Sequence, residues 1–219
     1  MTMHHAEMRL RLPQKPYLSI RDMRKGDEPQ VRKLLNRFLK ATSDLLPEFQ
    51  NDDEVSHWFF PKDRVVWTYV VEDPTRPNKL TDFVSFYSLP SSVLKSKGSS
   101  DSSQIKAAYL FYYATNPEPE VELTDKDVAS SEGSTKKKKT LIKERQIALV
   151  KQRLVALVGD ALIKARDAGF DVFNCINLLR NELFLEDLKF SKGDGLLYYY
   201  LYNWQTRGID ASRIGLVML

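Results

Sequence analysis

Three runs of β-branched and aromatic residues between positions 65 and 115 constrain the fold of this chain more than any other feature. They are VVWTYVV at 65–71, TDFVSFYSL at 81–89 and KAAYLFYYAT at 106–115. Residues of these types are enriched in strands. The turn-forming segment DPTRPN at 73–78 and a polar stretch at 91–103 separate the runs. We therefore predict three consecutive strands of one sheet.

Two helices and a strand are predicted ahead of these runs. An alternating stretch at 17–23 predicts the strand. The tetrapeptide GDEP at 26–29 supplies a capping Asp, a first-turn Glu and an early Pro, which together favour a helix start. A short second helix is predicted from a cap at Asp52 or Asp53 to Phe59, because a proline follows. In the first helix, apolar side chains recur at helical spacing, at Val31, Leu34, Leu35, Phe38 and Leu39.

The second half of the chain continues this alternation of helices and strands. A long amphipathic helix is predicted over 144–168, with Gly169 at the position beyond its end that favours glycine. The remaining elements are a strand at 170–175, a helix at 178–188 and strands at 196–203 and 213–219. The order β-α-α-β-β-β-α-β-α-β-β is typical of the GNAT acyltransferase fold, an α/β mixed β-sheet flanked by helices. This analogy concerns the fold and does not establish a function.

The composition predicts one globular domain with one long polar insert. Of the 219 residues, 42% are hydrophobic and 28% are charged, which fits a chain with a single core. Residues 1–16 are expected to form an N-terminal arm, and residues 17–219 the domain. From about 116 to 143 the chain holds six acidic and six basic residues and almost no large apolar ones. We expect this insert to be disordered, because it buries too little apolar surface to offset its ordering entropy.

Several classes of protein are disfavoured by the sequence. The net charge is +4, but the lysine run at 136–139 stands apart from the aromatic residues, so a nucleic-acid surface is not expected. No apolar stretch approaches the roughly 18 residues of a membrane span. The single Cys175 permits no internal disulfide and indicates a reducing, cytoplasmic location. The three histidines and this cysteine lack the spacing of a metal site.

The end of the chain carries a specific block of residues. Lys189-Phe190 is followed by Gly193-Asp194-Gly195, Leu197 and YYLYNW at 199–204. This block resembles the C-terminal part of the N-myristoyltransferases (glycylpeptide N-tetradecanoyltransferases), although Ser191 stands where that family usually has glycine. Further blocks resemble the family and occur in its order: HWFFP at 57–61, TDFVSFY at 81–87, LPS at 89–91, KAAY at 106–109, FY at 111–112 and GFDVFN at 169–174.

The resemblance implies a fold and an activity. Members of the family have two GNAT-like halves, of which the first binds myristoyl-CoA and the second supplies most of the peptide groove. They transfer myristate from myristoyl-CoA to the N-terminal glycine of proteins. This chain resembles the second half only, and MTM at 1–3 with Leu12-Pro13 is similar to the segment that joins the halves. The implied partners are N-terminal glycine peptides, with myristoyl-CoA bound only when a complementary N-terminal lobe is present.

The resemblance also implies candidate site residues. The general base of the family is its C-terminal carboxylate, and the matching group here is that of Leu219. A base is needed because a substrate α-amino group, with a pKa of about 7.7–8.0, is mostly ammonium at neutral pH. Burial would raise the basicity of the carboxylate. Four further residues match peptide-groove positions, although each also suits an ordinary structural role in a turn, strand end or core: Ser91, Tyr109, Asp194 and Leu197.

The sequence also indicates what this half does not bind. A GNAT unit holds the CoA pyrophosphate on the backbone N–H groups of a glycine-rich loop, and between Thr115 and Glu144 the only glycine is Gly133. We therefore expect no acyl-CoA or other cofactor to bind this half alone. Three alternatives stay open: a non-catalytic peptide-binding module, a fragment of a longer gene product, and a stand-alone GNAT acetyltransferase, which the missing loop disfavours. His57 is expected to have a packing role beside Trp58.

Overall fold

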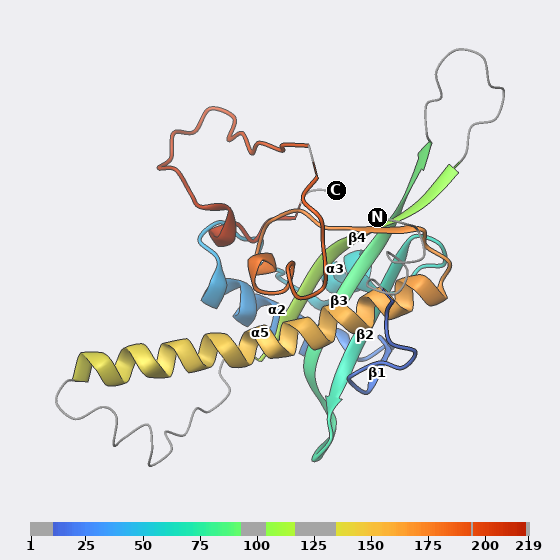
Figure 1. Ribbon diagram of the computed structural model, residues 1–219, viewed down its shortest axis with the longest axis horizontal. Coiled ribbons are helices and arrows are strands. Elements are labelled where there is room, and N and C mark those ends of the chain that lie inside the picture. The colour runs from blue at the N-terminus through green and yellow to red at the C-terminus, as the bar shows by residue number, and fades with distance from the viewer. Residues whose placement is uncertain (1–10, 93–103, 117–134, 194, 218–219) are drawn as a thin grey trace.

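A five-stranded sheet forms the centre of the molecule, with the strand order β1-β2-β3-β4-β5 (Figure 1). The first three pairings are antiparallel, and β5 runs parallel to β4. An open mixed sheet with helices on its faces is the α/β, GNAT-like architecture that the element order predicts. The computed structural model describes residues 11–92, 104–116, 135–193 and 195–217, and it describes the backbone alone at 92 and 135–139.

The strands predicted in the centre of the chain are confirmed. β2 (Val66–Asp73), β3 (Arg76–Ser92) and β4 (Gln104–Thr115) cover the three runs of strand-forming residues. β1 (Ile20–Asp22) and β5 (Val172–Asn174) form where strands were predicted, and both are shorter than predicted. Because these two short strands occupy the outer positions, β2, β3 and β4 each have a hydrogen-bonded neighbour on both sides.

The two faces of the sheet are covered by different helices. Asp82 and Phe83 are consecutive residues of β3 and therefore point to opposite faces. Asp82 is paired with Arg153 of α5 (Thr135–Asp167), whereas the Phe83 ring contacts Phe59 of α3 (Asp52–Phe59). α5 thus crosses one face, while α3 lies on the other together with α2 (Glu28–Thr42) (Figure 1). The apolar core is consequently divided into a layer on each side of the sheet.

The start of α3 corrects one prediction. The cap is Asn51 rather than Asp52 or Asp53, because Asn51 Oδ1 accepts a hydrogen bond from the Glu54 N–H at 2.9 Å. Glu54 Oε2 in turn accepts from the Gln50 N–H at 2.7 Å. Two backbone N–H groups near the helix start are satisfied in this way.

α5 corrects a second prediction, because it begins at Thr135 and not at 144. Residues 135–143 are therefore helical, and the expected disorder is wrong for that part; residues 117–134 lie outside the described part of the chain. Lysine has a high helix propensity, but a lysine run shows no apolar periodicity, so the pattern did not reveal these turns. The end of α5 follows the prediction: Gly169 has a φ of +77°, and the Phe170 N–H bonds to the Ala165 carbonyl.

The C-terminal region departs most from the sequence-based expectation. In place of a helix over 178–188, the chain forms one short 3₁₀ helix, η1 (Asn181–Leu183). Neither of the two final strands is present among the described residues. Residues 196–203 are irregular, and residues 214–217, which follow η2 (Ala211–Arg213), contribute a single bridge between Leu45 and Ile214. Strand-forming side chains make a strand only where a neighbouring strand supplies hydrogen bonds and an apolar face.

Candidate functional site

Aromatic side chains gather on the face of the sheet that carries α3. Tyr87 of β3 and Tyr109 of β4 are directly paired, and their rings stack with centroids 5.5 Å apart. The Phe111 ring lies edge-on to Tyr87 at 5.6 Å and contacts Trp58 of α3 at 6.4 Å. We call Trp58, Tyr87, Tyr109, Phe111 and Tyr112 the aromatic face.

A β-bulge in β4 brings Tyr112 to this face. The register of β3 with β4 shifts so that the single residue Ser85 lies opposite both Phe111 and Tyr112. Both rings consequently contact Phe59 of α3, with centroid distances of 5.3 Å for Phe111 and 5.7 Å for Tyr112. Regular alternation would have sent one of them to the face that α5 covers.

Two of the predicted groove residues lie on this side of the sheet. Tyr109 is half-buried within the aromatic face, and Ser91 is half-buried near the end of β3. Ser91 pairs with Ile105, and the register is regular from there to the pairing of Tyr87 with Tyr109. Because Ile105 and Tyr109 are an even number of residues apart, Ser91 and Tyr109 share one side of the ribbon. They are separated by about 13 Å along the strands.

The last described residue is bound to the aromatic face. The Val217 N–H donates a hydrogen bond to Tyr112 Oη at 3.0 Å. The preceding carbonyl, that of Leu216, accepts from Tyr199 Oη at 2.6 Å. Leu219 lies outside the described residues, so the role of its carboxylate stays a prediction.

A close backbone contact guides the chain to this position. The Gly215 N–H bonds to the Leu45 carbonyl at 2.7 Å, in the loop that follows α2. A Cβ atom at Gly215 would lie 2.5 Å from Ser43 Oγ, so a residue without a side chain is needed here. Arg213 adds an ion pair with Asp44. The loop after α2 therefore determines how the terminal segment approaches Tyr112.

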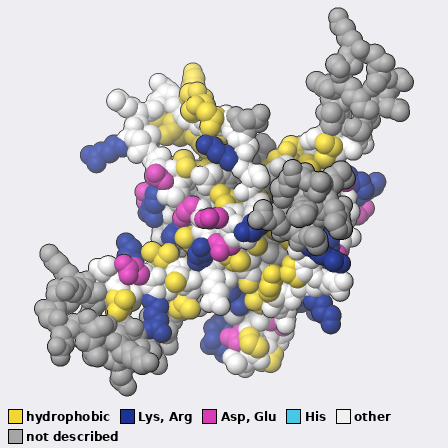
Figure 2. Space-filling model, in the orientation of Figure 1, with side chains coloured by type: hydrophobic (Ala, Val, Ile, Leu, Met, Phe, Trp, Pro, Cys, Tyr) yellow, Lys and Arg dark blue, Asp and Glu magenta, His cyan; other side chains and the backbone are white. Residues whose placement is uncertain are grey.

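The other two predicted groove residues are not brought to the aromatic face by any described contact. Asp194 lies outside the described residues. Leu197 is 71% exposed and belongs to an irregular segment, 196–204, that we call the aromatic loop. Figure 2 shows hydrophobic side chains at the surface in the upper part of the view, where Figure 1 places this loop. Its large apolar residues with exposed fractions of 45–94% are Leu196, Leu197, Tyr198, Tyr200, Leu201, Tyr202 and Trp204.

The aromatic face offers apolar contact and hydrogen bonds but no proton acceptor of its own. Burial raises the pKa of Tyr112 to about 12, and the hydrogen bond from the Val217 N–H partly opposes this shift. Burial raises the pKa of Tyr87 as well, with a smaller contribution from the neighbouring Tyr109. Both phenols are therefore neutral at pH 7. A reaction that removes a proton here needs a base from another part of the protein.

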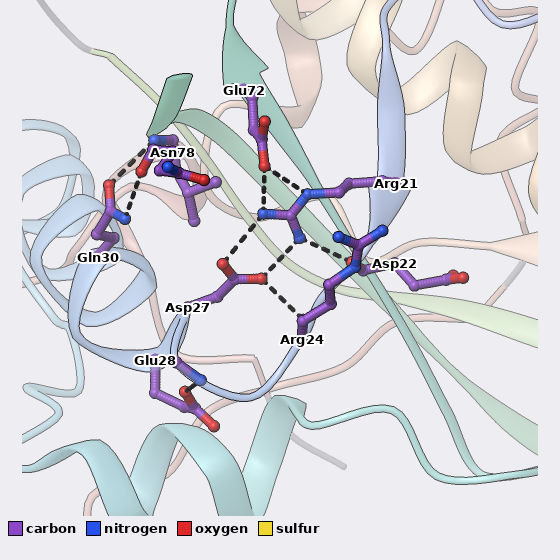
Figure 3. A network of polar contacts seen from close by, with 10 residues as sticks. Arg21, Asp22, Arg24, Asp27, Glu28, Gln30, Glu72 and Asn78 are labelled. Carbon is purple, nitrogen blue, oxygen red and sulfur yellow. Dashed lines mark hydrogen bonds and ion pairs between the residues drawn. The ribbon is translucent and has the colours of Figure 1, made fainter. Parts of the chain in front are cut away.

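A dense cluster of charged side chains lies elsewhere, where β1, β2 and the start of α2 meet (Figure 3). Arg21 donates from Nε to Glu72 Oε1 and from Nη1 to Asp27 Oδ2, each at 2.7 Å. Burial pushes the pKa of Asp27 upward, but hydrogen bonds from Arg21 and from the Arg24 N–H outweigh it and lower the pKa. These charges are matched to one another, so the cluster ties α2 to the sheet and is not a candidate site.

A neutral contact extends this tie to the β2–β3 hairpin. Gln30 Nε2 donates to the Asn78 carbonyl at 2.8 Å, and the Leu80 N–H donates back to Gln30 Oε1 at 3.1 Å (Figure 3). Asn78 has a φ of 63°, in the left-handed region that asparagine tolerates better than most residues. α2 is thereby held at both β1 and the hairpin.

The remaining chemical groups give no competing site among the described residues. The His57 ring is edge-on to Trp58 at 5.1 Å, a packing contact of the kind expected for this histidine. Burial raises the pKa of the Cys175 thiol to about 12, so it stays protonated. Within the described ranges, no group of His, Cys, Asp or Glu could hold a metal ion. None of the helices described is both long and apolar enough to cross a membrane.

The sequence-based reasoning missed Tyr112 and the loop after α2. The signal that could have revealed Tyr112 is the run Leu110–Tyr113, in which four large apolar residues follow one another in a strand. Such a run requires burial on both faces or a bulge, and here a bulge is present. Nothing local marks Leu45 as a neighbour of Ile214, because the contact joins residues far apart in the sequence.

Comparison of the sequence with known proteins gives one consistent family. The family model described as "Myristoyl-CoA:protein N-myristoyltransferase, C-terminal domain" matches residues 1–217. The chain is 42% identical over 203 residues to glycylpeptide N-tetradecanoyltransferase of Schizosaccharomyces pombe. The matched region covers 89% of this chain and 38% of that protein. The chain is 37% identical over 219 residues to glycylpeptide N-tetradecanoyltransferase 2 of Bos taurus, covering 100% of this chain and 36% of that protein. The chain thus spans less than half the length of these relatives.

Solved structures give the same picture. The crystal structure of Saccharomyces cerevisiae N-myristoyltransferase with bound myristoyl-CoA superposes with a TM-score of 0.69 and 32% identity, over 89% of this chain and 42% of that one. A mutant of the BH1408 protein of Bacillus halodurans gives a TM-score of 0.50 with 12% identity, over 84% of this chain and 99% of that one. The second likeness concerns the fold alone.

Proposed function

This chain belongs to the N-myristoyltransferase family, and we propose that it forms the peptide-binding half of a glycylpeptide N-tetradecanoyltransferase. In this proposal a complementary lobe holds myristoyl-CoA, and the two together transfer myristate to the N-terminal glycine of a protein. The observation that carries the proposal is the hydrogen bond from the Val217 N–H to Tyr112, because it leads the end of the chain to the aromatic face. A cytoplasmic location is part of the proposal and is supported by the single, half-buried Cys175.

The proposed peptide groove runs over the aromatic face. Tyr109 offers a stacked ring and Ser91 a hydroxyl on the same side of the β3–β4 ribbon, about 13 Å apart, which is the length of about four extended residues. Asp194 and Leu197 are proposed as further contacts on the strength of the family resemblance. An extended peptide fits this arrangement, because aromatic surfaces bind apolar side chains and hydroxyls bind backbone groups.

The proposed general base is the α-carboxylate of Leu219. The peptide ammonium loses a proton to this carboxylate, and the neutral amine attacks the thioester carbonyl. The C–N bond then forms and the C–S bond breaks. The second proton of the former ammonium passes to the departing sulfur, so CoA leaves as the thiol. Two residues beyond Val217 can span at most about 7 Å. The bond to Tyr112 therefore limits how far this carboxylate can be from the aromatic face.

The aromatic loop is proposed to be where the complementary lobe docks. Its side chains are exposed along nearly the whole segment, whereas surfaces of monomeric soluble proteins rarely expose contiguous apolar patches of this kind. The relatives are more than twice as long as this chain, so they contain further residues that could form such a lobe. A peptide-binding module without catalysis remains the second candidate, because the groove by itself requires no base.

Two binding measurements test the groove and the absence of a cofactor site. A glycine-starting peptide is expected to bind this chain weakly by calorimetric titration, and the same peptide with an acetylated N-terminus is expected to bind less well. Equal affinities would contradict recognition of the amine. Myristoyl-CoA is expected to show no micromolar binding, because Gly133 is the sole glycine between Thr115 and Glu144. Tight binding would contradict the division of labour between the two lobes.

The base is tested in a protein with the N-terminal lobe of a relative fused ahead of Met1. Semisynthesis that converts the Leu219 carboxylate to an amide is expected to lower acyl transfer by about 10²–10⁴-fold, the usual contribution of a general base. Leu219→Ala, which keeps the carboxylate, is the matched control and should retain most of the activity. Normal transfer by the amide would make Asp194 the leading candidate. Peptide binding without transfer in the unmodified fusion would favour the non-catalytic module.

A further inference from the structure

The described part of the N-terminal arm and the two residues that follow it, Tyr17 and Leu18, lie against the C-terminal half of α5. The Tyr17 and Leu18 N–H groups donate to the two carboxylate oxygens of Asp160, at 2.6 and 2.8 Å. Further upstream, the Pro13 carbonyl accepts from Arg166 Nη1 at 2.9 Å. Asp160 and Arg166 are six residues apart, which corresponds to about 9 Å along a helix. The segment 13–18, at the end of the arm, is therefore fastened to one helix at two separate points.

Both Asp160 and its neighbour Gly159 are unfavourable residues for the interior of a helix. Glycine costs about 1 kcal/mol relative to alanine in that position. At Gly159 a Cβ atom would lie 3.3 Å from Tyr17 Cε2, so the missing side chain makes room for the Tyr17 ring. Asp160 is buried, and burial raises the pKa of its carboxyl against the opposing effect of the two N–H donors. Gly159 and Asp160, two adjacent residues that helices disfavour, thus both contact the short segment at Tyr17 and Leu18.

These contacts fix the orientation of the segment but bury little of its surface. Tyr17 remains 61% exposed, so its ring adds little to the core. Pro13 and Pro16 fix their own φ angles and restrict the residues before them to extended conformations. A stiff segment that is held at two points transmits its direction to the residues upstream of it.

We propose that Gly159 and Asp160 form a clamp that sets the direction in which the chain upstream of Tyr17 leaves this domain. Asp160 is then a positioning residue for acyl transfer, because that direction places the preceding lobe relative to the aromatic face. The second statement rests on the proposed function, since it requires a lobe ahead of the arm. The clamp itself rests only on the contacts of Tyr17 and Leu18.

The clamp is tested first by amide hydrogen exchange on this chain. Asp160→Ala is expected to speed exchange of the Tyr17 and Leu18 amides by at least about tenfold, the loss expected for hydrogen bonds to a charged group. The amides of β2, β3 and β4 should be unaffected. Asp187→Ala is the matched control, because Asp187 pairs at 2.8 Å with Lys151, which precedes Asp160 by nine residues in α5. Unchanged exchange at Tyr17 and Leu18 would overturn the clamp.

A second variant, Gly159→Ala, tests the clamp even if Asp160→Ala disturbs the folding of the protein. Gly159→Ala keeps the Asp160 carboxylate and a good helix former, and it pushes only against the Tyr17 ring. We expect it to raise exchange at Tyr17 and Leu18 while leaving the unfolding midpoint nearly unchanged or slightly higher. If the Tyr17 and Leu18 amides of this variant exchange as slowly as in the unmodified protein, glycine is not required at position 159.

The positioning role is tested by supplying the N-terminal lobe of a relative in two ways. When the lobe is fused ahead of Met1, Asp160→Ala is expected to lower kcat by about 10–100-fold, the effect of a small misplacement. The affinity for the peptide should not change. When the lobe is added as a separate chain, the same variant should have no effect, since no arm connects the lobes. Equal losses in both formats would indicate a merely structural role and overturn the proposal.

A readout without catalysis separates this proposal from the proposed function. Small-angle X-ray scattering of the fused protein should give a broader distance distribution for Asp160→Ala than for Asp187→Ala. A fused protein that transfers no acyl group would contradict the proposed function, while scattering and hydrogen exchange would still decide on the clamp. Identical distributions for both variants would overturn the positioning role.

Discussion

β4 and the aromatic loop are rich in the same aromatic and aliphatic residues, but β4 is a buried strand and the loop is irregular and exposed. β4 contains LFYYA at 110–114, and these side chains are buried between neighbouring strands and helices. The loop contains LLYYYLYNW at 196–204, and most of these side chains face solvent. β4 pairs with β3 along its length and with β5 at residues 107–109, whereas no described strand pairs with the loop. Strand propensity alone therefore does not make a strand; a partner with free hydrogen-bonding groups decides the outcome.

The largest expected effect comes from removing the ring that joins α3 to the sheet. Phe59 is fully buried, and its ring contacts Phe49, Phe83, Phe111 and Tyr112. Phe59→Ala should lower the free energy of unfolding by about 3–5 kcal/mol. Urea denaturation monitored by circular dichroism measures the change, with the exposed Tyr202→Ala as the control. Comparable destabilisation by both variants would show that the loop is packed as tightly as the sheet.

An intermediate effect is expected where the C-terminal segment touches the body of the protein. Gly215→Ala introduces a Cβ atom 2.5 Å from Ser43 Oγ and 3.2 Å from Leu39 Cδ2. It should destabilise the protein by about 1–3 kcal/mol, as overpacking does. Gly208→Ala is the control, because no heavy atom lies within 4 Å of a Cβ there. Ser43→Gly should partly rescue Gly215→Ala; without any rescue, the contact would not be the source of the loss.

A pH-dependent effect should distinguish the less exposed Arg21–Asp27 pair, where β1 meets α2, from the more exposed Arg213–Asp44 pair near the end of the chain. The pKa of Asp27 is lowered by Arg21 and the Arg24 N–H in spite of burial, so its stabilising contribution is complete above the ordinary aspartate pKa. That contribution is lost as the pH falls through the lowered pKa of the folded state. Asp27→Asn should therefore be more destabilising at pH 7 than at pH 2, by thermal unfolding across that range.

The exposed pair in the C-terminal region supplies the comparison for this titration. The pKa of Asp44 is also lowered, mainly by its hydrogen bond to Arg213, but solvent screens a pair at the surface. Asp44→Asn should change the acid dependence of unfolding less than Asp27→Asn does. The reverse order would mean that the terminal segment, rather than the junction of β1 and α2, governs acid stability.

The smallest effect on stability is expected within the aromatic loop itself. Trp204 is 81% exposed, so Trp204→Ser should change the free energy of unfolding by no more than about 0.5 kcal/mol. In a variant that keeps Trp204 as its single tryptophan, acrylamide should quench the fluorescence readily. Addition of the N-terminal lobe of a relative should reduce this quenching if the loop docks there. Quenching that the lobe leaves unaltered would contradict the proposed interface.

The parts of the fold that the sequence predicted well are those fixed by local rules. α2 follows its apolar period, α3 ends before the proline as predicted although its cap is Asn51, and Gly169 terminates α5. β2, β3 and β4 combine strong strand propensity with turn residues between them, so the meander needed no further information. For the candidate site, the sequence supplied Ser91 and Tyr109 through a family resemblance, and the regular register of β3 with β4 places them on one side.

Tertiary contacts alone decided the rest. The bulge opposite Ser85 turns Tyr112 to the aromatic face, and strand propensity does not encode a register shift between two strands. Leu179 takes a φ of 55° with its N–H bonded to the Ile214 carbonyl, a contact between distant residues where a helix was predicted. The loop after α2 holds the terminal segment through the bond from the Gly215 N–H to the Leu45 carbonyl, and residues 196–203 have no strand partner among the described residues. Hydrogen bonds within a helix are satisfied by neighbours in sequence, whereas those of a strand depend on where the rest of the chain lies.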